Sequence, residues 1–386
     1  MFLKEVKLHE FRNFQSLAIK LNERVNFFVG NNGQGKTNFL EAVYLLSRGN
    51  TFRPSENKSL VNFNSKNKIS KLTGLFTSRE MDFKAELVIA DGKRAAHLNN
   101  KRVNSVDLTR SLPTILFSPE SLSAIKEGPE QRRLLLDELI ITQNPGQISL
   151  IREYSKALRQ RNKLLQDLSE ASGSQKKTLE ATLESLNSIF LLLATHLSQA
   201  RILALREIAP RLGDAMAMIT GGEAGDISVE YLISGTSALN FTDQEVFDAL
   251  RKRHQELSAK EIASGRSLVG PHKHDVVFLF AGNDSRFYCS QGQQRALILA
   301  LKIAQIVYHQ QVHQTVPILL LDDVLSELDP TKRENLMKFV EGISAQVLIT
   351  ATDLTWPEQF NIGHSLNANS VFSVEEGRIE SHSLSR

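Results

Sequence analysis

Residues 30–37 restrict the possible folds of this chain more than any other part of the sequence. Gly30-Asn-Asn-Gly-Gln-Gly-Lys-Thr37 fits the pattern G-x-x-x-x-G-K-[ST] at every fixed position. An apolar run, Val25 to Val29, precedes it, and helical spacing of Phe39, Val43 and Leu46 follows. Glycines let the backbone curl so that its N–H groups point inward, and a helix start adds the positive end of its dipole. Strand, loop and helix in this order predict an α/β sheet with a phosphate-binding loop.

This loop predicts a nucleotide triphosphate as ligand, with ATP and Mg²⁺ as cofactors. Lys36 is expected to reach the β and γ phosphates, and the Thr37 hydroxyl to coordinate Mg²⁺. A glycine-rich turn that matches by chance is the alternative, and the strand and helix on either side argue against it. The expected nucleotide contacts here are Gly30, Asn31, Asn32, Gly33, Gln34, Gly35, Lys36 and Thr37.

A second candidate element is the apolar run Ile318 to Leu321, which ends in Asp322 and Asp323. A buried strand that ends in an acid beside a phosphate loop commonly holds Mg²⁺. We therefore expect Asp322 to bind the metal together with Thr37, and Asp323 to act as general base toward the attacking water. The alternative is two solvated acids at a strand end.

A third element, residues 289–295, reads Cys-Ser-Gln-Gly-Gln-Gln-Arg and precedes an apolar-patterned helix. Ser290 is a favourable helix N-cap, and Gly292 allows a ligand to approach the helix start. This segment resembles the signature of ABC-type ATPases, which implies that Ser290, Gly292 and Gln293 contact the nucleotide of another subunit. The alternative is a helix cap without a ligand.

The two ends of the chain share an α/β pattern, whereas the middle is helical. Asp91-Gly92 predicts a hairpin within a polar, strand-like stretch, residues 51–113. Residues 148–218 contain little Gly or Pro and carry apolar residues at alternating spacings of four and three, typical of a coiled coil. These are Leu179, Leu183, Leu186, Phe190, Leu193, Leu197, Ala200 and Ala204.

We therefore predict an α/β fold, with an ATPase head formed by residues 1–145 plus 266–386. Residues 146–265 are predicted to form an inserted helical arm, a short antiparallel coiled coil that turns near residues 170–175. An ordinary helical bundle in a second domain is the alternative.

Composition excludes some classes of protein. One cysteine rules out an intramolecular disulfide framework and multi-cysteine zinc sites. No apolar run approaches the roughly 18 residues of a membrane helix, and the charged N-terminus lacks the apolar core of a signal peptide. We expect a cytoplasmic protein without a membrane partner.

The net charge of +3 permits a polyanionic partner. Four cations on residues 148–170 lie at i, i+4, i+7 and i+11, which places them on one face of a helix. Such a row can neutralise phosphates without reading sequence, so it is a candidate DNA-binding surface. A solvated helix face is the alternative. The four residues are Arg152, Lys156, Arg159 and Lys163.

With these features, the chain resembles the RecF family of bacterial recombination-repair proteins, SMC-like and ABC-type ATPases. The resemblance implies ATP-driven homodimers, reset by weak, DNA-dependent ATP hydrolysis in an enzyme that is not a nuclease. It also implies binding of single-stranded and gapped or linear duplex DNA, recombination mediator partners, RecA loading, and roles in replication and the SOS response. Besides the segments above, the matching text is Glu10 to Phe14, Leu116 to Glu120, Gln160 to Asn162, Leu268 to His272, and Leu321 to Asp329.

Two departures from ABC-type patterns predict slow hydrolysis. Asp323 stands where such sites commonly carry Glu, and Thr350 or Thr352 stands where transporters often carry His.

Two other functions remain open at this point. The ATPase subunit of a transporter usually has a stricter Leu-Ser-Gly-Gly-Gln signature, and an SMC-like structural tether needs a much longer coiled coil.

Overall fold

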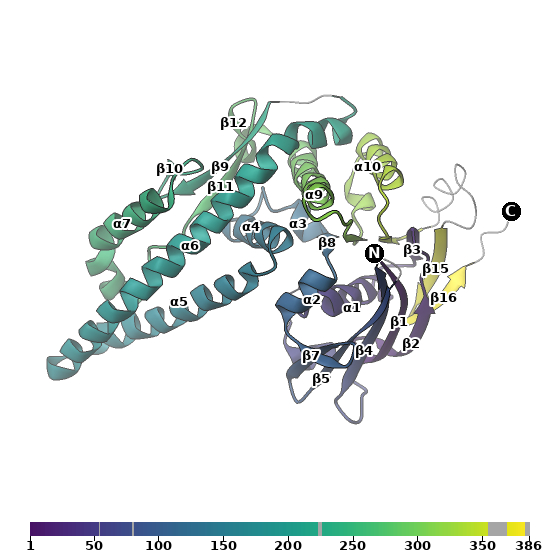
Figure 1. The fold of residues 1–386 in the computed structure, drawn as a ribbon, viewed down its shortest axis with the longest axis horizontal. Coiled ribbons are helices and arrows are strands. Elements are labelled where there is room, and N and C mark those ends of the chain that lie inside the picture. The colour runs from purple at the N-terminus through teal and green to yellow at the C-terminus, as the bar shows by residue number, and fades with distance from the viewer. Residues whose placement is uncertain (54, 79–80, 223–225, 354–368, 383–386) are drawn as a thin grey trace. The chain divides into compact units, whose positions relative to one another are not determined.

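The computed structural model describes residues 1–53, 55–78, 81–222, 226–353 and 369–382. The chain divides into two compact units, and each is assembled from separate stretches of sequence. The first unit contains Met1–Leu122, Ala215–Glu223 and Ile298–Arg386, and the second contains Ser123–Asp214 and Ala224–Leu297. Figure 1 labels the elements used below.

The first unit contains a six-stranded sheet in the order β16-β15-β3-β14-β13-β8. The strands β3, β14, β13, β8 and β15 are parallel, and only β16 is antiparallel to its neighbour. β3 and β8 come from the N-terminal part of the chain and the others from the C-terminal part, as the α/β pattern at both ends predicted. Their bounds are β3 Val25–Val29, β8 Thr114–Phe117, β13 Ile318–Leu321, β14 Val347–Ala351, β15 Asn369–Glu375 and β16 Arg378–His382.

A second, antiparallel sheet of the same unit has the order β2-β1-β4-β5-β6-β7. Asp91 and Gly92 both have positive φ and connect β5 to β6, which confirms the predicted hairpin. Helix α1 (Lys36–Arg48) packs its apolar face into a buried cluster that includes residues of both sheets. The strands are β1 Phe2–Phe11, β2 Phe14–Lys20, β4 Ser70–Ser78, β5 Met81–Ala90, β6 Lys93–Leu98 and β7 Lys101–Val103.

Short helices and turns complete this unit. Helix α10 (Pro330–Gly342) lies between β13 and β14 in sequence. Its N-cap is Asp329, whose side chain accepts a hydrogen bond from the N–H of Lys332. The remaining elements are the 3-10 turns η1 (Asn57–Leu60) and η2 (Leu325–Glu327), with α2 (Ser105–Ser111) and α3 (Pro119–Leu122).

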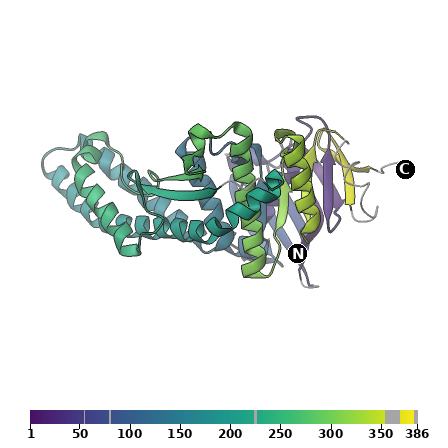
Figure 2. The same cartoon turned by 90° about the horizontal axis from the view of Figure 1, so that it is seen from above.

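Helices dominate the second unit. Helix α5 (Gln147–Glu170) and helix α6 (Gly173–Thr220) are separated by two residues, at the predicted turn. Leu165 and Leu168 of α5 pack on Leu183 of the heptad seam, and Ile262 of a third helix, α7 (Asp243–Ser264), packs against them. The hairpin of α5 and α6 is therefore present, and α7 joins it, as Figure 2 also shows.

Helix α6 is long and apolar enough to cross a membrane, with a window of mean hydropathy 1.5. Within that window 61% is buried inside the protein, as is usual for the core helix of a globular unit. Phe190, Ala194 and Leu197 are among its buried apolar residues, whereas Ile189, Leu192 and Leu203 are exposed.

The second unit also contains a four-stranded antiparallel sheet that the sequence analysis missed, in the order β10-β9-β11-β12. Strand β9 falls inside the stretch predicted to be helical and pairs with β11, which had been assigned to the α/β head. The compact units thus have other boundaries than the predicted 1–145 plus 266–386 and 146–265. The elements are β9 Ile227–Ile233, β10 Thr236–Ser237, β11 Asp275–Phe280, β12 Asn283–Asp284, α4 Pro129–Gln143, α8 Ser285–Tyr288 and α9 Gln291–His313, the last of which continues into the first unit.

Candidate nucleotide-binding site

The phosphate loop connects β3 to α1, as predicted, and two of its glycines are required by their surroundings. A Cβ at Gly30 would lie 2.2 Å from the carbonyl oxygen of Val374 on the neighbouring strand β15. Gly35 has φ +116, and a Cβ there would lie 2.4 Å from Nδ2 of Asn13. The loop is therefore packed against its neighbours with no room for side chains at these positions.

Lys36 lies in the first turn of α1 and is 6% exposed. Its ammonium group donates to the carbonyl oxygen of Asn31 at 2.9 Å and to that of Gly30. Burial lowers the pKa of Lys36, and the nearby carboxylates of Asp323 and Asp322 oppose this effect. The loop's only ammonium group is thus directed into the loop and lies near both predicted acids.

Asp322 follows β13 and is brought to the phosphate loop although it lies far away in sequence. Thr37 donates its hydroxyl to Oδ1 of Asp322 at 2.8 Å, and the buried Thr350 donates to the same oxygen at 3.1 Å. Arg53 lies 3.7 Å from the other carboxylate oxygen. Burial raises the pKa of Asp322, and the hydrogen bond from Thr37 counters this.

The two side chains expected to hold Mg²⁺ therefore meet, and a hydroxyl with a carboxylate oxygen is a donor set that suits this ion. Among the described residues, no group of three or more His, Cys, Asp and Glu side chains could hold a metal by itself.

Asp323 differs from its neighbour in its backbone and its exposure. It has φ +51, in the left-handed region that is unusual for a residue other than glycine, and its N–H donates to Oγ1 of Thr350 at 2.7 Å. Asp323 lines a cavity of about 200 Å³ together with Gly33, Lys36 and Thr37. The two adjacent acids thus face different surroundings: Asp322 is buried against Thr37, whereas Asp323 borders the open space beside the loop.

Sequence reasoning missed several neighbours of this site. Arg53 lines the same cavity, and no motif marked it. Asn13 donates to the carbonyl oxygen of Gln34 at 2.9 Å and accepts from Asn38 at 2.8 Å, which ties the first hairpin to the loop. Asn13 lies within the segment Glu10 to Phe14, so its position in that motif was the only available signal.

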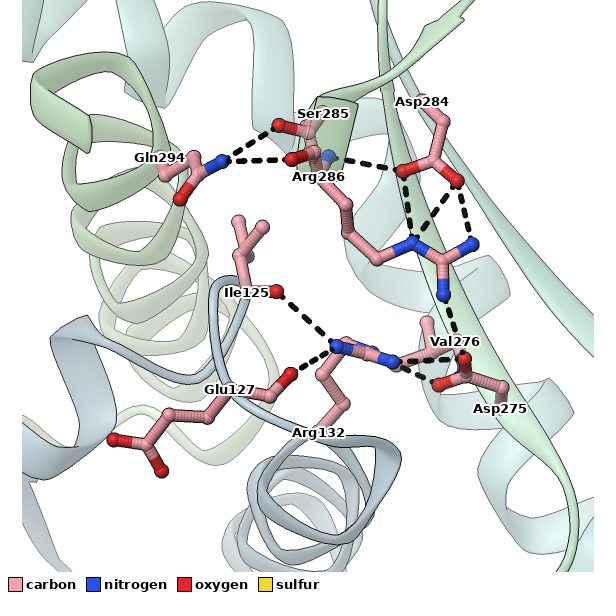
Figure 3. Close-up of polar contacts among 9 residues, drawn as sticks. All are labelled: Ile125, Glu127, Arg132, Asp275, Val276, Asp284, Ser285, Arg286 and Gln294. Carbon is pink, nitrogen blue, oxygen red and sulfur yellow. Dashed lines mark hydrogen bonds and ion pairs between the residues drawn. The ribbon is translucent and has the colours of Figure 1, made fainter. Parts of the chain in front are cut away.

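The signature segment, residues 289–295, forms the start of α9 in the second unit. Ser290 accepts from the N–H of Gln293 at 3.2 Å, and Oε1 of Gln293 accepts from the N–H of Ser290 at 2.8 Å. The predicted N-cap is therefore confirmed as a reciprocal cap, and Ser290 itself is exposed. Nε2 of the buried Gln294 donates to the carbonyl oxygen of Ser285 at 2.9 Å, which holds the preceding turn against α9 (Figure 3).

A chain of alternating charges fixes that turn from its other side (Figure 3). Nε of Arg286 donates to both oxygens of Asp284 at 3.0 Å, and its Nη1 donates to Asp275 at 3.1 Å. Arg132 of α4 holds the same Asp275 with two bonds of 2.9 Å. The Arg132 side chain is only 2% exposed, so its charge serves this network and is not available to a partner.

Three of residues 272–275, to which the sequence analysis assigned no role, have structural contacts: Asp275 in the network above, and His272 and His274 in buried hydrogen bonds. His272 accepts from the Tyr154 hydroxyl at 2.6 Å and donates to the carbonyl oxygen of Ser267 at 3.1 Å. Burial lowers the pKa of His272 to about 4. His274 is buried against the Tyr231 hydroxyl at 2.9 Å.

The four cations of the candidate DNA-binding row are all exposed on α5. Lys163 also forms a salt bridge of 2.8 Å with Asp167, the exposed kind that contributes little to stability. Their spacing along one helix face thus leaves them accessible to a partner.

A largely parallel sheet with a phosphate loop after β3, an acid-tipped strand β13 one position beyond its neighbour β14, and a separate Ser-Gln-Gly-Gln helix start together define an ABC-type P-loop ATPase head. The family model of the RecF/RecN/SMC N terminal domain matches residues 2–373. The chain belongs to the RecF family: it is 35% identical to the DNA replication and repair protein RecF of Heliobacterium modesticaldum, covering 98% of this chain and 99% of that one.

Other relatives agree with this assignment. The DNA replication and repair protein RecF of Geobacter sp. strain M21 is 33% identical, over 98% of this chain and 100% of its own. A solved structure of the recombination mediator protein RecF-ATP in the RecFOR pathway is 28% identical, with a TM-score of 0.85 over 99% of this chain and 98% of that one. The Smc head domain of Pyrococcus furiosus, 17% identical with a TM-score of 0.53, covers 100% of this chain and 96% of that one and shares the fold. The transporter subunit and the structural tether are not favoured.

Proposed function

We propose that this chain is an ATP-dependent DNA-binding protein of replication and recombinational repair. The observation that carries the proposal is the hydrogen bond of 2.8 Å between Thr37 and Asp322. It places the end of an apolar strand beside the phosphate loop, as nucleotide and Mg²⁺ binding requires. The similar RecF structure with ATP supports ATP as the nucleotide.

In this proposal, Gly30 to Thr37 surround the phosphates, and the Lys36 ammonium neutralises the β and γ groups. Thr37 and Asp322 hold Mg²⁺, which when bound neutralises charge on the phosphates. Asp323 orients and deprotonates the attacking water from its place at the cavity edge. An aspartate reaches less far than the usual glutamate, so the proposed hydrolysis is slow. We further propose, from family membership, that DNA stimulates it.

The proposed state with bound ATP is a homodimer. Ser290, Gly292 and Gln293 of one copy contact the nucleotide held by the phosphate loop of the other. The exposure of Ser290 and its position at a capped helix start support this role, because helix N-termini attract phosphate. ATP binding thus drives association, and hydrolysis releases it.

DNA, single-stranded or gapped and linear duplex, is the proposed partner, bound in part by Arg152, Lys156, Arg159 and Lys163. The RecF relatives named for DNA replication and repair support this partner. By the same family membership we propose that the protein acts in the cytoplasm, without a membrane. There it joins recombination mediator proteins, assists RecA loading and contributes to the SOS response.

The experiment that tests this proposal is calorimetric titration with ATP and Mg²⁺, followed by binding to a labelled gapped duplex with and without ATP. We expect Lys36→Ala to abolish tight ATP binding, because no other ammonium group lies in the loop, and to abolish the ATP dependence of DNA binding. Unchanged nucleotide affinity in Lys36→Ala would overturn the nucleotide site. If the parent protein does not bind the duplex with or without ATP, the proposal that DNA is its partner is wrong.

A further inference from the structure

A groove in the second unit lies between α5 and the turn that follows α7. It has a volume of about 540 Å³, and its lining includes the cations Arg159, Lys163 and Arg266 but no carboxylate. Arg159 and Arg266 form no salt bridge within the described part of the chain, and both are exposed. The fold thus brings two unpaired guanidinium groups, more than a hundred residues apart in sequence, to the same groove.

A buried network beneath the groove fixes its shape. Arg161 forms a two-pronged ion pair with Glu261 of α7, at 2.9 and 2.7 Å, with both side chains 1% exposed. Burial alone would raise the pKa of Glu261, but hydrogen bonds from His254 and Arg161 lower it to about 2. The pair therefore stays charged and ties α7 to α5 near neutral pH.

The same network holds the turn that carries Arg266. Ser267 donates its N–H to Oδ1 of Asn162 at 2.8 Å, and Leu268 donates to Glu261 at 2.7 Å. Gly265 has φ +63, and a Cβ there would lie 3.4 Å from Cα of Gln166, so the turn lies directly against α5. The motifs Gln160 to Asn162 and Leu268 to His272 matched in the sequence without a role. Both contribute hydrogen bonds to this network, through Arg161 and Asn162 on one side and Leu268 on the other.

We propose that this groove binds the phosphodiester backbone of DNA and receives phosphates at the end of the α5 row, a proposal that rests on the DNA-binding function proposed above. The row from Arg152 to Lys163 covers about 16 Å of helix axis, which matches about five base steps at 3.4 Å. A continuous row of cations suits a chain of phosphates better than a single anion. Arg266 adds a guanidinium from the opposite side, with a planar fork that matches phosphate geometry.

The test is the salt dependence of binding to a labelled gapped duplex, measured by anisotropy on the full chain with ATP. Arg266→Gln lies outside the α5 row, and we expect it to lower the slope of log K against log salt by about 1, and together with Arg159→Gln by about 2. Asn162→Asp keeps the acceptor for Ser267 and adds a negative charge, so it should also weaken binding. Lys252→Gln removes an exposed charge of α7 outside the groove and should change little. Unchanged melting temperatures show that the variants fold.

The outcomes separate the two proposals. If Lys156→Gln weakens DNA binding and Arg266→Gln does not, the groove is not a phosphate site and the DNA-binding function stands. If the parent protein does not bind DNA, both proposals are overturned. If Arg266→Gln abolishes binding of a labelled polyglutamate peptide and leaves DNA binding unchanged, the groove takes an acidic peptide and the proposal is wrong.

Discussion

Asp322 and Asp323 are adjacent in sequence, yet their side chains have opposite surroundings. Asp322 is 2% exposed and receives hydroxyl hydrogen bonds from Thr37 and Thr350, whereas Asp323 borders the cavity beside Lys36. Successive side chains at the end of a strand point to opposite sides of the sheet, and Asp323 in addition has a left-handed backbone conformation. Two chemically identical residues therefore lie in different surroundings, which supports the different roles proposed for them.

We expect Asp323→Asn to leave ATP binding close to that of the parent and to slow turnover by about 10²–10⁴-fold, the usual contribution of a general base. Asp322→Asn should instead weaken nucleotide binding only when Mg²⁺ is present, because the amide lowers the affinity for the cation. Titrations with and without Mg²⁺, paired with single-turnover hydrolysis, measure both effects. Parent-like turnover in Asp323→Asn would remove it as the base.

His272 makes stability depend on pH. Its pKa in the folded state is about 4, below its ordinary value of 6.5, because burial disfavours the charged form. The unfolded chain therefore binds the proton first, so stability is complete above pH 6.5 and is lost as pH falls toward 4. At pH 5 the loss from this residue is about 2 kcal/mol.

Urea unfolding at pH 7 and pH 5 measures this loss. His272→Gln keeps an acceptor for Tyr154 and cannot be protonated, so the difference between the two pH values should shrink. The buried His274 and His309, whose pKa values are also lowered by burial, contribute in the same direction in both proteins. An equal pH dependence in parent and variant would contradict the role of His272.

Among the elements, the start of α9 is held by contacts on two sides of the turn that precedes it. Gln294 holds the preceding turn from within the helix, and Arg286 with Asp275 and Arg132 holds it from β11 and α4 (Figure 3). Two independent sets of contacts thus orient an exposed Ser290. The proposed contact with the nucleotide of a second copy requires that Ser290 be held in a fixed position. A small displacement of a group that donates a hydrogen bond to a phosphate weakens that hydrogen bond.

We expect Ser290→Arg to bind ATP as the parent does, because the phosphate loop is untouched, and to lose ATP-driven dimerisation, because a bulky charged side chain blocks the close approach of helix and phosphate. Hydrolysis should fall with dimerisation. Light scattering with and without ATP measures the outcome, and Ser290→Thr, which retains the capping hydroxyl, is the matched control. Normal dimerisation of Ser290→Arg would mean that the segment is a helix cap alone.

Most of the phosphate site could be predicted from sequence because its residues come in local motifs: the loop, the acid-tipped strand and the helix cap. Thr350 was noted only as a replacement for His, and Arg53 was missed, because their contacts with Asp322 depend on chain segments that meet only in the fold. Strand β9 was missed for the same reason, since its partner β11 is more than forty residues away.

At the scale of the whole molecule, each unit is built from stretches that are distant in sequence. The parallel sheet takes only β3 and β8 from residues 1–122, and these two strands are not neighbours. The antiparallel sheet, in contrast, lies completely within those residues. The two sheets of one unit therefore differ in how much of the chain each requires.

A fragment of residues 1–122 should consequently form the antiparallel sheet in part and fail to bind ATP, although it contains the complete phosphate loop. Without β14 and β15, the strand β3 has no partner to hold the loop. Titration with ATP, together with limited proteolysis at β3, measures this, and the full chain is the control. Tight ATP binding by the fragment would show that the loop folds without its sheet.

Because β3 lies between β14 and β15, it can join its sheet only after most of the chain has been synthesised. The phosphate loop is among the first parts of the chain to leave the ribosome, but the strands on both sides of β3 are among the last. A nascent chain therefore carries the whole loop sequence through most of translation with no sheet to organise it. If nucleotide binding needs this sheet, as proposed above, a chain whose synthesis stops before β15 carries the complete loop sequence and does not bind ATP.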